Sequence, residues 1–287
     1  MPFGKYQTYY RITGDLHSKQ TPLLLLHGGP GSTHNYFEIF DQLVEKTGRP
    51  IVMYDQLSCG KSDIPTDSSL YTAKTWVAEL QALRTYLNLN EVHLLGQSWG
   101  GMLAIIYMCD YAPQGVKSLI LASTLSSSKL WAQEQHRMIK FMSPEDQEAI
   151  ADAETSNQFT DQAYLTANDH FMEQHASGPI TEDSPEFLRR DKVFGEAAYE
   201  TAWGPNEYYP TGNLKDYDYT NRLHNITTPT LITSGTNDLC TPLIAKTMYD
   251  QLPNSQWTLF SHSRHMAFID ETDSYMLRLR KWLEEND

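Results

Sequence analysis

A serine nucleophile is indicated by the pentapeptide Gly96-Gln97-Ser98-Trp99-Gly100, which matches the pattern Gly-x-Ser-x-Gly. The pentapeptide lies between a β-rich run, Val92 to Leu95, and a helical run that starts at Trp99. A sharp turn from strand to helix crowds its neighbours, so glycines at both flanks allow the Ser98 hydroxyl to point outward at the helix N-terminus. The sequence therefore predicts a nucleophile elbow.

A serine hydroxyl is a weak nucleophile, and it needs a histidine base that is held in place by a carboxylate. When the serine sits on such an elbow, the chain order is Ser, Asp, His. Asp238 and His265 satisfy that order, and each follows a predicted strand by a short loop. We expect both at the same edge of the sheet as Ser98, where ligands bind in open α/β folds. His262 is the rival for the base.

A glycine-rich turn, His27-Gly28-Gly29-Pro30-Gly31, directly follows a short apolar run of four leucines. Such a turn can aim the backbone N–H of Gly29 at a developing oxyanion, and the N–H of Trp99 would be the second donor. A phosphate-cradling loop is the alternative interpretation. It is disfavoured because the turn lacks both a Gly-Lys-Ser/Thr ending and a Gly-x-Gly-x-x-Gly frame.

Alternating strands and helices must position these residues. Short β-rich runs alternate with longer amphipathic runs, which is typical of helix layers around a largely parallel sheet, an α/β architecture. In one expected helix the large apolar residues recur at steps of 4, 3 and 4, which places them on one face. The expected strands are residues 8–13, 23–26, 51–54, 92–95, 118–122, 229–233 and 256–260, and the expected helices are residues 73–87, 99–111, 243–252 and 274–283.

The alternation breaks in the middle of the chain. Residues 126–222 are polar and helical with acidic clusters, and no clear strand appears there. We expect this stretch to be a helical cap inserted into a core formed by residues 1–125 and 223–287.

Composition excludes several classes of partner. The chain has 22 Lys plus Arg against 36 Asp plus Glu, a formal net charge of −14, whereas nucleic-acid binding needs clustered basic residues. No apolar run is long enough to suggest a membrane span, and we expect no signal peptide. The three cysteines are an odd number without paired spacing, so we expect free thiols in a reducing cytoplasm. No metal-ligand spacing is visible, so neither a metal nor a cofactor is expected.

Taken together, these motifs resemble those of the proline iminopeptidase (prolyl aminopeptidase) family of the α/β-hydrolase fold. The matching pieces span most of the chain in the family's order. They are residues 27–31, Tyr54-Asp55-Gln56 with Cys59-Gly60 and Ser62, residues 96–101, Gly204-Pro205-Asn206-Glu207, and the loops of Asp238 and His265. The resemblance implies release of an N-terminal residue, often proline, from short peptides through an acyl-enzyme, without a cofactor.

The resemblance also implies how the free amino terminus of the substrate is held. Glu207 stands where a cap-side carboxylate of the family grips the substrate amine, and Tyr199 is similar to a family tyrosine that lines the same site. Two positions depart from the family. Leu239 stands where some relatives carry a second acid, and Leu57-Ser58 replaces Arg-Gly in the family's Asp-Gln-Arg-Gly run.

We therefore predict a serine aminopeptidase in which Ser98 attacks, His265 is the base and Asp238 orients it. Its partner would be a small peptide or amino-acid derivative with a free N-terminus. We expect it to bind neither nucleic acid nor a membrane. The two departures leave open a dipeptidase, or an amidase or esterase acting on small amino-acid derivatives. A non-catalytic ligand receptor of the same fold is a further alternative. The oligomeric state is not determined by the sequence.

Overall fold

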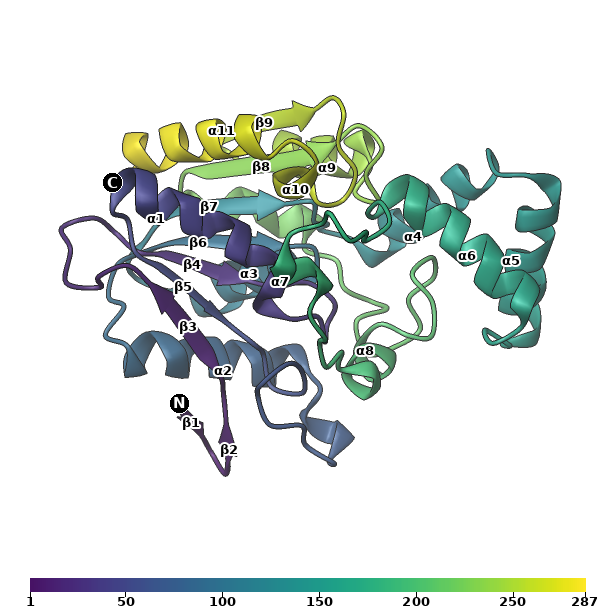
Figure 1. The fold of residues 1–287 in the computed structure, drawn as a ribbon, viewed down its shortest axis with the longest axis horizontal. Coiled ribbons are helices and arrows are strands. Elements are labelled where there is room, and N and C mark those ends of the chain that lie inside the picture. Colours follow the sequence, from purple (N-terminus) through teal and green to yellow (C-terminus); the bar gives the residue numbers. More distant parts are fainter.

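The computed structural model describes the whole chain, Met1 to Asp287. Its centre is a seven-stranded sheet with the strand order β3-β5-β4-β6-β7-β8-β9 (Figure 1). Neighbouring strands are parallel except at one edge, where β3 pairs antiparallel with β5, so the predicted mostly parallel α/β sheet is confirmed. The strands are β3 (Tyr10–Thr13), β4 (Leu23–Leu26), β5 (Ile51–Tyr54), β6 (Val92–Gln97), β7 (Val116–Ala122), β8 (Thr230–Gly235) and β9 (Ser255–Phe260). Two short strands, β1 (Pro2–Phe3) and β2 (Tyr6–Gln7), form a separate antiparallel pair.

Every residue of β4, β5 and β6 is buried, which is the pattern of strands covered on both faces. Side chains alternate between the two faces along a strand. In β4, Leu24 and Leu26 join one apolar cluster, while Leu23 and Leu25 join a second one on the opposite face. The continuous apolar runs in the sequence therefore form the middle layer between two cores.

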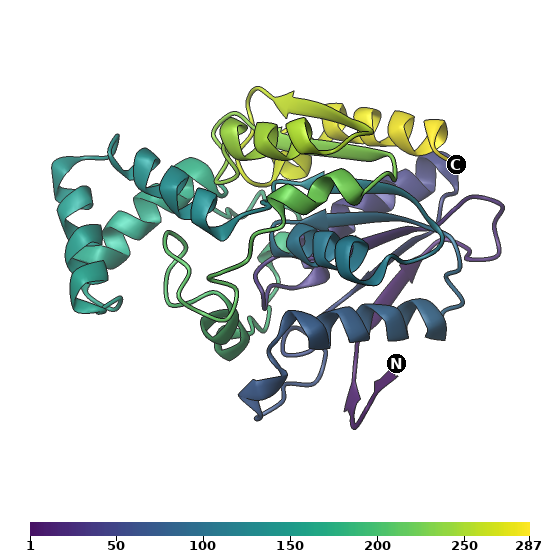
Figure 2. The ribbon, with the colours of Figure 1, turned by 180° about the vertical axis from the view of Figure 1, so that it is seen from behind.

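Helices cover both faces of the sheet. The first cluster includes apolar residues of α2 (Ala73–Tyr86), α3 (Trp99–Tyr111) and α9 (Pro242–Gln251), which lie in front of the sheet in Figure 2. The second includes residues of the 3-10 helix η1 (His34–Phe40), α1 (Asp41–Thr47), α10 (Ala267–Asp270) and α11 (Thr272–Glu285). None of the helices combines the length and apolar character needed to cross a membrane.

A mostly helical segment separates β7 from β8, and we call residues 123–229 the inserted segment. Its helices α4, α5 and α6 project beyond the carboxyl ends of the parallel strands (Figure 1). An isolated bridge between Ser127 and Asp218 joins the two ends of the segment. The helices are α4 (Ser128–Ile139), α5 (Pro144–Ser156), α6 (Gln162–His175), α7 (Glu186–Arg189), α8 (Glu196–Ala202) and the 3-10 helix η3 (Thr220–Asn225).

Some boundaries differ from the sequence expectation. The first strand of the large sheet begins at Tyr10 rather than Thr8, because the Thr8 N–H donates to Met1 O and the Tyr9 N–H donates to Ser62 Oγ, so neither N–H is available to β5. The short elements β1, β2, η1, α1, α10 and the 3-10 helix η2 (Ser68–Leu70) were not expected. They are only two to seven residues long, too short for a periodic pattern to form.

Candidate active site

Strand register brings the predicted catalytic loops to one edge of the sheet. Leu26 of β4 pairs with Gly96 of β6, so the turn that follows β4 lies beside the turn that carries Ser98. The chain runs from β4 outward in opposite directions to β5 and β6, and such a switch point is where open α/β sheets bind ligands. The loops after β8 and β9, which carry Asp238 and His265, leave from the same edge.

Ser98 occupies a strained turn between β6 and α3. Its backbone has φ 54° and ψ −123°, a conformation that costs free energy for a residue with a Cβ. The two flanking glycines are sterically required, because a Cβ on Gly96 would lie 2.2 Å from the Gly100 oxygen and one on Gly100 would lie 2.0 Å from the Leu26 oxygen. The turn is anchored by the Ser98 N–H, which donates to Ala122 O at 3.0 Å. This geometry matches the nucleophile elbow that the spacing predicts.

His265 is oriented by a carboxylate that the fold holds rigidly. Its Nδ1 lies 2.7 Å from Asp238 Oδ1. Asp238 is almost fully buried and also accepts hydrogen bonds from Ser123 Oγ (2.6 Å), the Cys240 N–H (2.8 Å) and the Gly235 N–H (3.1 Å). With donors on both oxygens, the carboxylate is fixed in one orientation. An ionised carboxylate can only accept hydrogen bonds, so the Nδ1 atom of His265 must carry the proton that it donates. Nε2 of His265 is thereby left free to receive a proton.

His262, the rival base, lies outside the cavity that contains Ser98. It is exposed, and its backbone N–H donates to Glu271 Oε2 at 2.9 Å. The structure therefore brings His265, and not His262, together with Asp238 and the serine.

Two backbone N–H groups have the character of oxyanion donors. The Trp99 N–H is the first of α3, and the first turn of a helix has no internal acceptor for such groups. The Gly29 N–H, in the turn after β4, donates to no other group of the protein. The neighbouring Gly28 N–H is already used, because it donates to Tyr36 Oη at 2.6 Å, and that hydroxyl donates to Gln97 Oε1 at 3.0 Å. The Tyr36 side chain thus ties the glycine turn to the elbow.

A cavity of about 540 Å³ is lined by five of the seven predicted site residues; the buried Asp238 and Trp99 lie outside its lining. Ser98, His265, Gly29, Tyr199 and Glu207 all line it. Its volume is in the range of small-ligand sites. Further lining residues come from the inserted segment, which supplies one wall, and they include Met172, Ile180, Leu188, Lys192 and Phe194.

Glu207 brings a negative charge to this cavity. The Tyr199 hydroxyl donates to Glu207 Oε2 at 2.5 Å, while Oε1 accepts no hydrogen bond from the protein. Burial raises the pKa of Glu207 above its ordinary value, and the Tyr199 hydrogen bond and the nearby His265 offset that shift only in part. The other carboxylate in the lining, Asp270, is paired with Arg264 at 2.9 Å. Glu207 is therefore a carboxylate that has no cationic partner within the protein and could pair with a cation of the substrate.

The two departures from the family pattern lie in different places. Leu239 lines the cavity, so an apolar surface stands there instead of a second acid. Leu57 and Ser58 do not line it; Leu57 is buried behind the site, where its N–H donates to both carboxylate oxygens of Glu79 at 3.0 Å. Only the Leu239 departure can therefore contact a ligand in the cavity.

The glycine turn and the Asp-Gln run form a hydrogen-bonded platform behind the elbow. Gln56 Nε2 donates to His27 O at 3.0 Å, and Trp99 Nε1 donates to Gln56 Oε1 at 2.8 Å. His27 accepts the Gln56 N–H at Nε2, and burial lowers its pKa to about 4, so the ring is neutral. These residues hold the two N–H donors of Gly29 and Trp99 in a fixed relation to each other.

Three contributors escaped the sequence analysis. Ser123 holds Asp238, Tyr36 holds the glycine turn, and Trp131 donates from Nε1 to Glu207 O at 2.9 Å while its ring packs edge-on against His265, with centroids 6.2 Å apart. For Ser123 a signal existed, because a polar residue directly follows the buried strand β7. No group of His, Cys, Asp or Glu side chains is arranged to hold a metal ion.

A family model described as alpha/beta hydrolase fold matches residues 21–272. A proline iminopeptidase of Lactiplantibacillus plantarum is 72% identical over 287 residues, and the match covers 100% of both chains. The crystal structure of VinJ superposes with a TM-score of 0.92 at 32% identity, covering 100% of this chain and 98% of that one. The crystal structure of a Mycobacterium smegmatis proline iminopeptidase superposes with a TM-score of 0.87 at 28% identity, covering 99% of this chain and 97% of that one.

Proposed function

Since the chain belongs to the proline iminopeptidase family of the α/β-hydrolase fold, we propose that Ser98, His265 and Asp238 catalyse its reaction, the removal of an N-terminal residue, proline above all, from short peptides. The protein is an enzyme, a serine hydrolase with prolyl aminopeptidase activity. One observation carries the assignment of its site. A serine elbow, a histidine on a fixed carboxylate and a carboxylate without a cation all face one cavity.

In this mechanism Ser98 Oγ attacks the carbonyl carbon of the first residue while His265 Nε2 takes the hydroxyl proton. Asp238 keeps the proton of the imidazole on Nδ1 and stabilises the imidazolium. His265 then gives its proton to the leaving amine as the peptide bond breaks, which leaves an acyl-enzyme on Ser98. Water attacks this ester with His265 again as base, and the free N-terminal residue leaves.

The N–H groups of Gly29 and Trp99 are the proposed donors to the oxyanion of each tetrahedral intermediate. They are supported by their lack of other partners and by the platform that holds them. Such donors need no reorganisation when the negative charge develops, and loss of one typically costs about 100- to 1,000-fold in kcat.

Recognition of the free amine is assigned to Glu207, with Tyr199 orienting its carboxylate. A substrate ammonium at Oε1 would supply the cation that Glu207 lacks, and burial makes that pairing stronger than it would be in water. Leu239 offers an apolar surface suited to the methylene groups of a proline ring. Exopeptidase specificity then follows from charge, because a blocked N-terminus brings no cation to Glu207.

Residues 126–222 of the inserted segment are the proposed cap over the core. Two hydrogen bonds support a tie between cap and catalytic residues: the His265 N–H donates to His175 O at 3.1 Å, and Trp131 Nε1 donates to Glu207 O. The three cysteines are free, which suits a cytoplasmic location.

Substitution of the nucleophile tests the assignment. Ser98→Ala should lower kcat on prolyl-β-naphthylamide by about 10⁴- to 10⁶-fold while the far-UV spectrum and Tm remain those of a folded protein. A fluorophosphonate should label the wild type and fail to label this variant. A folded variant that keeps more than a tenth of the activity would remove Ser98 from the mechanism.

A further inference from the structure

The charged side chains around the active-site cavity divide into paired and unpaired ones. Arg264 and Asp270 neutralise each other. Glu207 and Lys192 have no partner of opposite charge, although both line the same cavity. Glu207 is half-buried, so its charge is costly unless a ligand compensates it, whereas Lys192 is exposed at the rim, where its ammonium is accessible to a ligand. The cavity therefore carries one free negative and one free positive group.

Lys192 has donors to spare. Its Nζ makes one hydrogen bond, to Leu188 O at 2.8 Å, and an ammonium has three N–H groups. Although Lys192 is an exposed residue, desolvation of its ammonium by the surrounding chain and the neighbouring Arg190 lower its pKa, and no carboxylate acts against them. An anion that reached Nζ would relieve both effects.

Lys192 stands between the active site and a second cavity. That outer cavity, of about 480 Å³, shares Ser32, Ile180, Leu188 and Phe194 with the first, so the two adjoin. A peptide whose first carbonyl lies at Ser98 can leave the inner cavity by this route. The shared residues are mostly apolar and would contact the second side chain of the peptide, while Lys192 lies beside its continuation.

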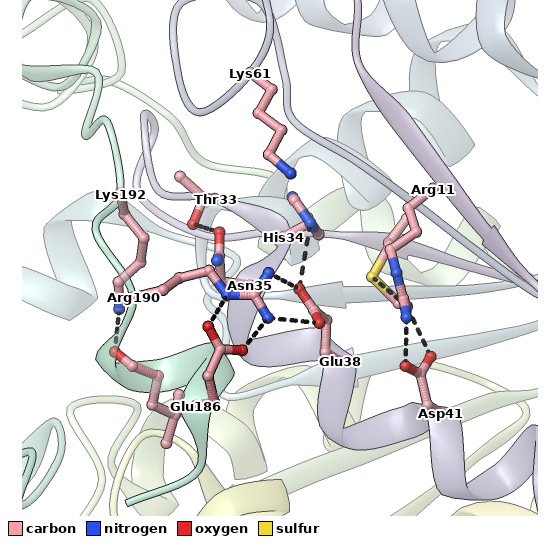
Figure 3. Close-up of polar contacts among 12 residues, drawn as sticks. Arg11, Thr33, His34, Asn35, Glu38, Asp41, Lys61, Glu186, Arg190 and Lys192 are labelled. Atoms are coloured by element: carbon pink, nitrogen blue, oxygen red, sulfur yellow. Dashed lines mark hydrogen bonds and ion pairs between the residues drawn. The ribbon is translucent and has the colours of Figure 1, made fainter. Parts of the chain in front are cut away.

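The backbone around Lys192 is fastened to the core. The Gly60 N–H donates to Val193 O at 2.8 Å, and the Gly195 N–H donates to Gly31 O at 2.7 Å. Arg190 bridges two acids: it donates to both carboxylate oxygens of Glu38 at 2.9 and 3.0 Å, and to Glu186 (Figure 3). Lys192 is therefore presented from a fixed segment and not from a loose loop.

Building on the proposed function, we propose that Lys192 binds the C-terminal carboxylate of short peptide substrates, foremost dipeptides with an apolar second residue. Glu207 holds the ammonium at one end of such a zwitterion and Lys192 holds the carboxylate at the other, with the scissile bond at Ser98 between them. Lys192 is thus a specificity determinant that favours free dipeptides over capped peptides. Arg189 and Asp191 line only the outer cavity, beyond this contact.

The test compares L-Pro-L-Phe with L-Pro-L-Phe amide, which differ only in the carboxylate charge. We measure kcat/KM from release of phenylalanine or its amide by chromatography, for the wild type and for Lys192→Gln. The wild type should favour the free acid by about 3- to 10-fold, the effect of a charge-assisted contact that is partly open to solvent. Lys192→Gln should lose that preference, with the amide and prolyl-β-naphthylamide hydrolysed within about 2-fold of the wild-type rate.

Matched variants complete the experiment. Lys46→Gln removes an exposed charge from α1 and should leave the preference unchanged, whereas Lys192→Arg should retain most of it. Equal losses on acid, amide and naphthylamide would make Lys192 structural and overturn the proposal. The proposal would also be overturned if Lys192→Gln kept the preference for the free acid, or if the wild type had no such preference. A preference that disappears in Arg189→Gln and not in Lys192→Gln would overturn it as well. Failure of the proposed function itself would be distinct, because the wild type would then not hydrolyse prolyl-β-naphthylamide.

Discussion

Replacing Glu207 by glutamine tests the feature that separates an aminopeptidase from a general esterase. The substitution keeps the shape of the side chain and removes its charge. In the folded protein this carboxylate has one hydrogen-bond donor, Tyr199, and no basic neighbour other than His265 when that is protonated. The change should therefore act on the substrate ammonium and leave the pairing of His265 with Asp238 intact.

The size of the effect follows from how few groups share the charge. A charge-assisted hydrogen bond contributes about 1.5 to 3 kcal/mol, which corresponds to roughly 10- to 150-fold in kcat/KM. Leu239 cannot contribute, and Asp270 is occupied by Arg264. We therefore expect Glu207→Gln to lower kcat/KM for prolyl-β-naphthylamide by an amount in the upper half of that range.

The assay pairs this substrate with p-nitrophenyl acetate, a neutral ester that has no ammonium. Hydrolysis of the ester by the same preparation of Glu207→Gln should change less than about 3-fold. Glu196→Gln is the matched control, since Glu196 is an exposed acid of the inserted segment that does not line the cavity. Equal losses on both substrates would show that Glu207 is structural. No loss on either would place the amine elsewhere and favour the amidase or esterase interpretation.

Three further predictions concern the catalytic residues and one buried acid. His265→Ala should abolish measurable turnover of prolyl-β-naphthylamide and His262→Ala should leave it near normal; the reverse result would make His262 the base. Ser123→Ala removes one of four donors to the Asp238 carboxylate and should lower kcat by about 2- to 12-fold, and an unchanged kcat would show that this hydrogen bond does not matter. Burial raises the pKa of Glu79 to about 7, so between its ordinary pKa of 4.5 and 7 the folded state holds a proton that the unfolded state releases. This group therefore lowers the free energy of unfolding by roughly 1.4 kcal/mol per pH unit over that window, whereas the buried His27, whose pKa is lowered to about 4, acts in the opposite direction below pH 6.5. The stability of Glu79→Gln relative to the wild type, measured by urea unfolding, should therefore rise as pH rises from 4.5 to 7, and a difference that does not change with pH would contradict the shift.

The sequence was sufficient to predict a site residue wherever its position is set by contacts with its near neighbours in the chain. The two glycines around Ser98 are demanded by contacts within a single turn, so their spacing in the chain reveals the elbow. The loops that carry Asp238 and His265 were predictable because strands of a parallel sheet all end at one edge, so the loop that follows each strand leaves from that edge. The position of Glu207 was available only through the resemblance to a family, since nothing in its immediate neighbours marks an acid that faces a cavity.

Other features depend on contacts between residues far apart in the chain. The position of Ser123 directly after a strand marks it as a candidate site residue, but its pairing with Asp238 follows only from β7 and β8 being neighbours. The raised pKa of Glu207 requires the burial that the inserted segment provides. The isolation of Lys192 is likewise decided by which acids its neighbours already pair with, because Arg190 takes both Glu38 and Glu186.

The sequence by itself determined the class of fold and the loops that carry the proposed nucleophile, acid and base, because steric demands of a turn and the polarity of parallel strands act over a few residues. The tertiary structure alone decided which histidine meets Asp238, which N–H groups stay unpaired and where free charge remains in the cavity. Hydrogen bonds and ion pairs are exclusive, so a donor or charge is available to a substrate only if no distant part of the chain has already satisfied it. That availability is a property of the whole packed molecule.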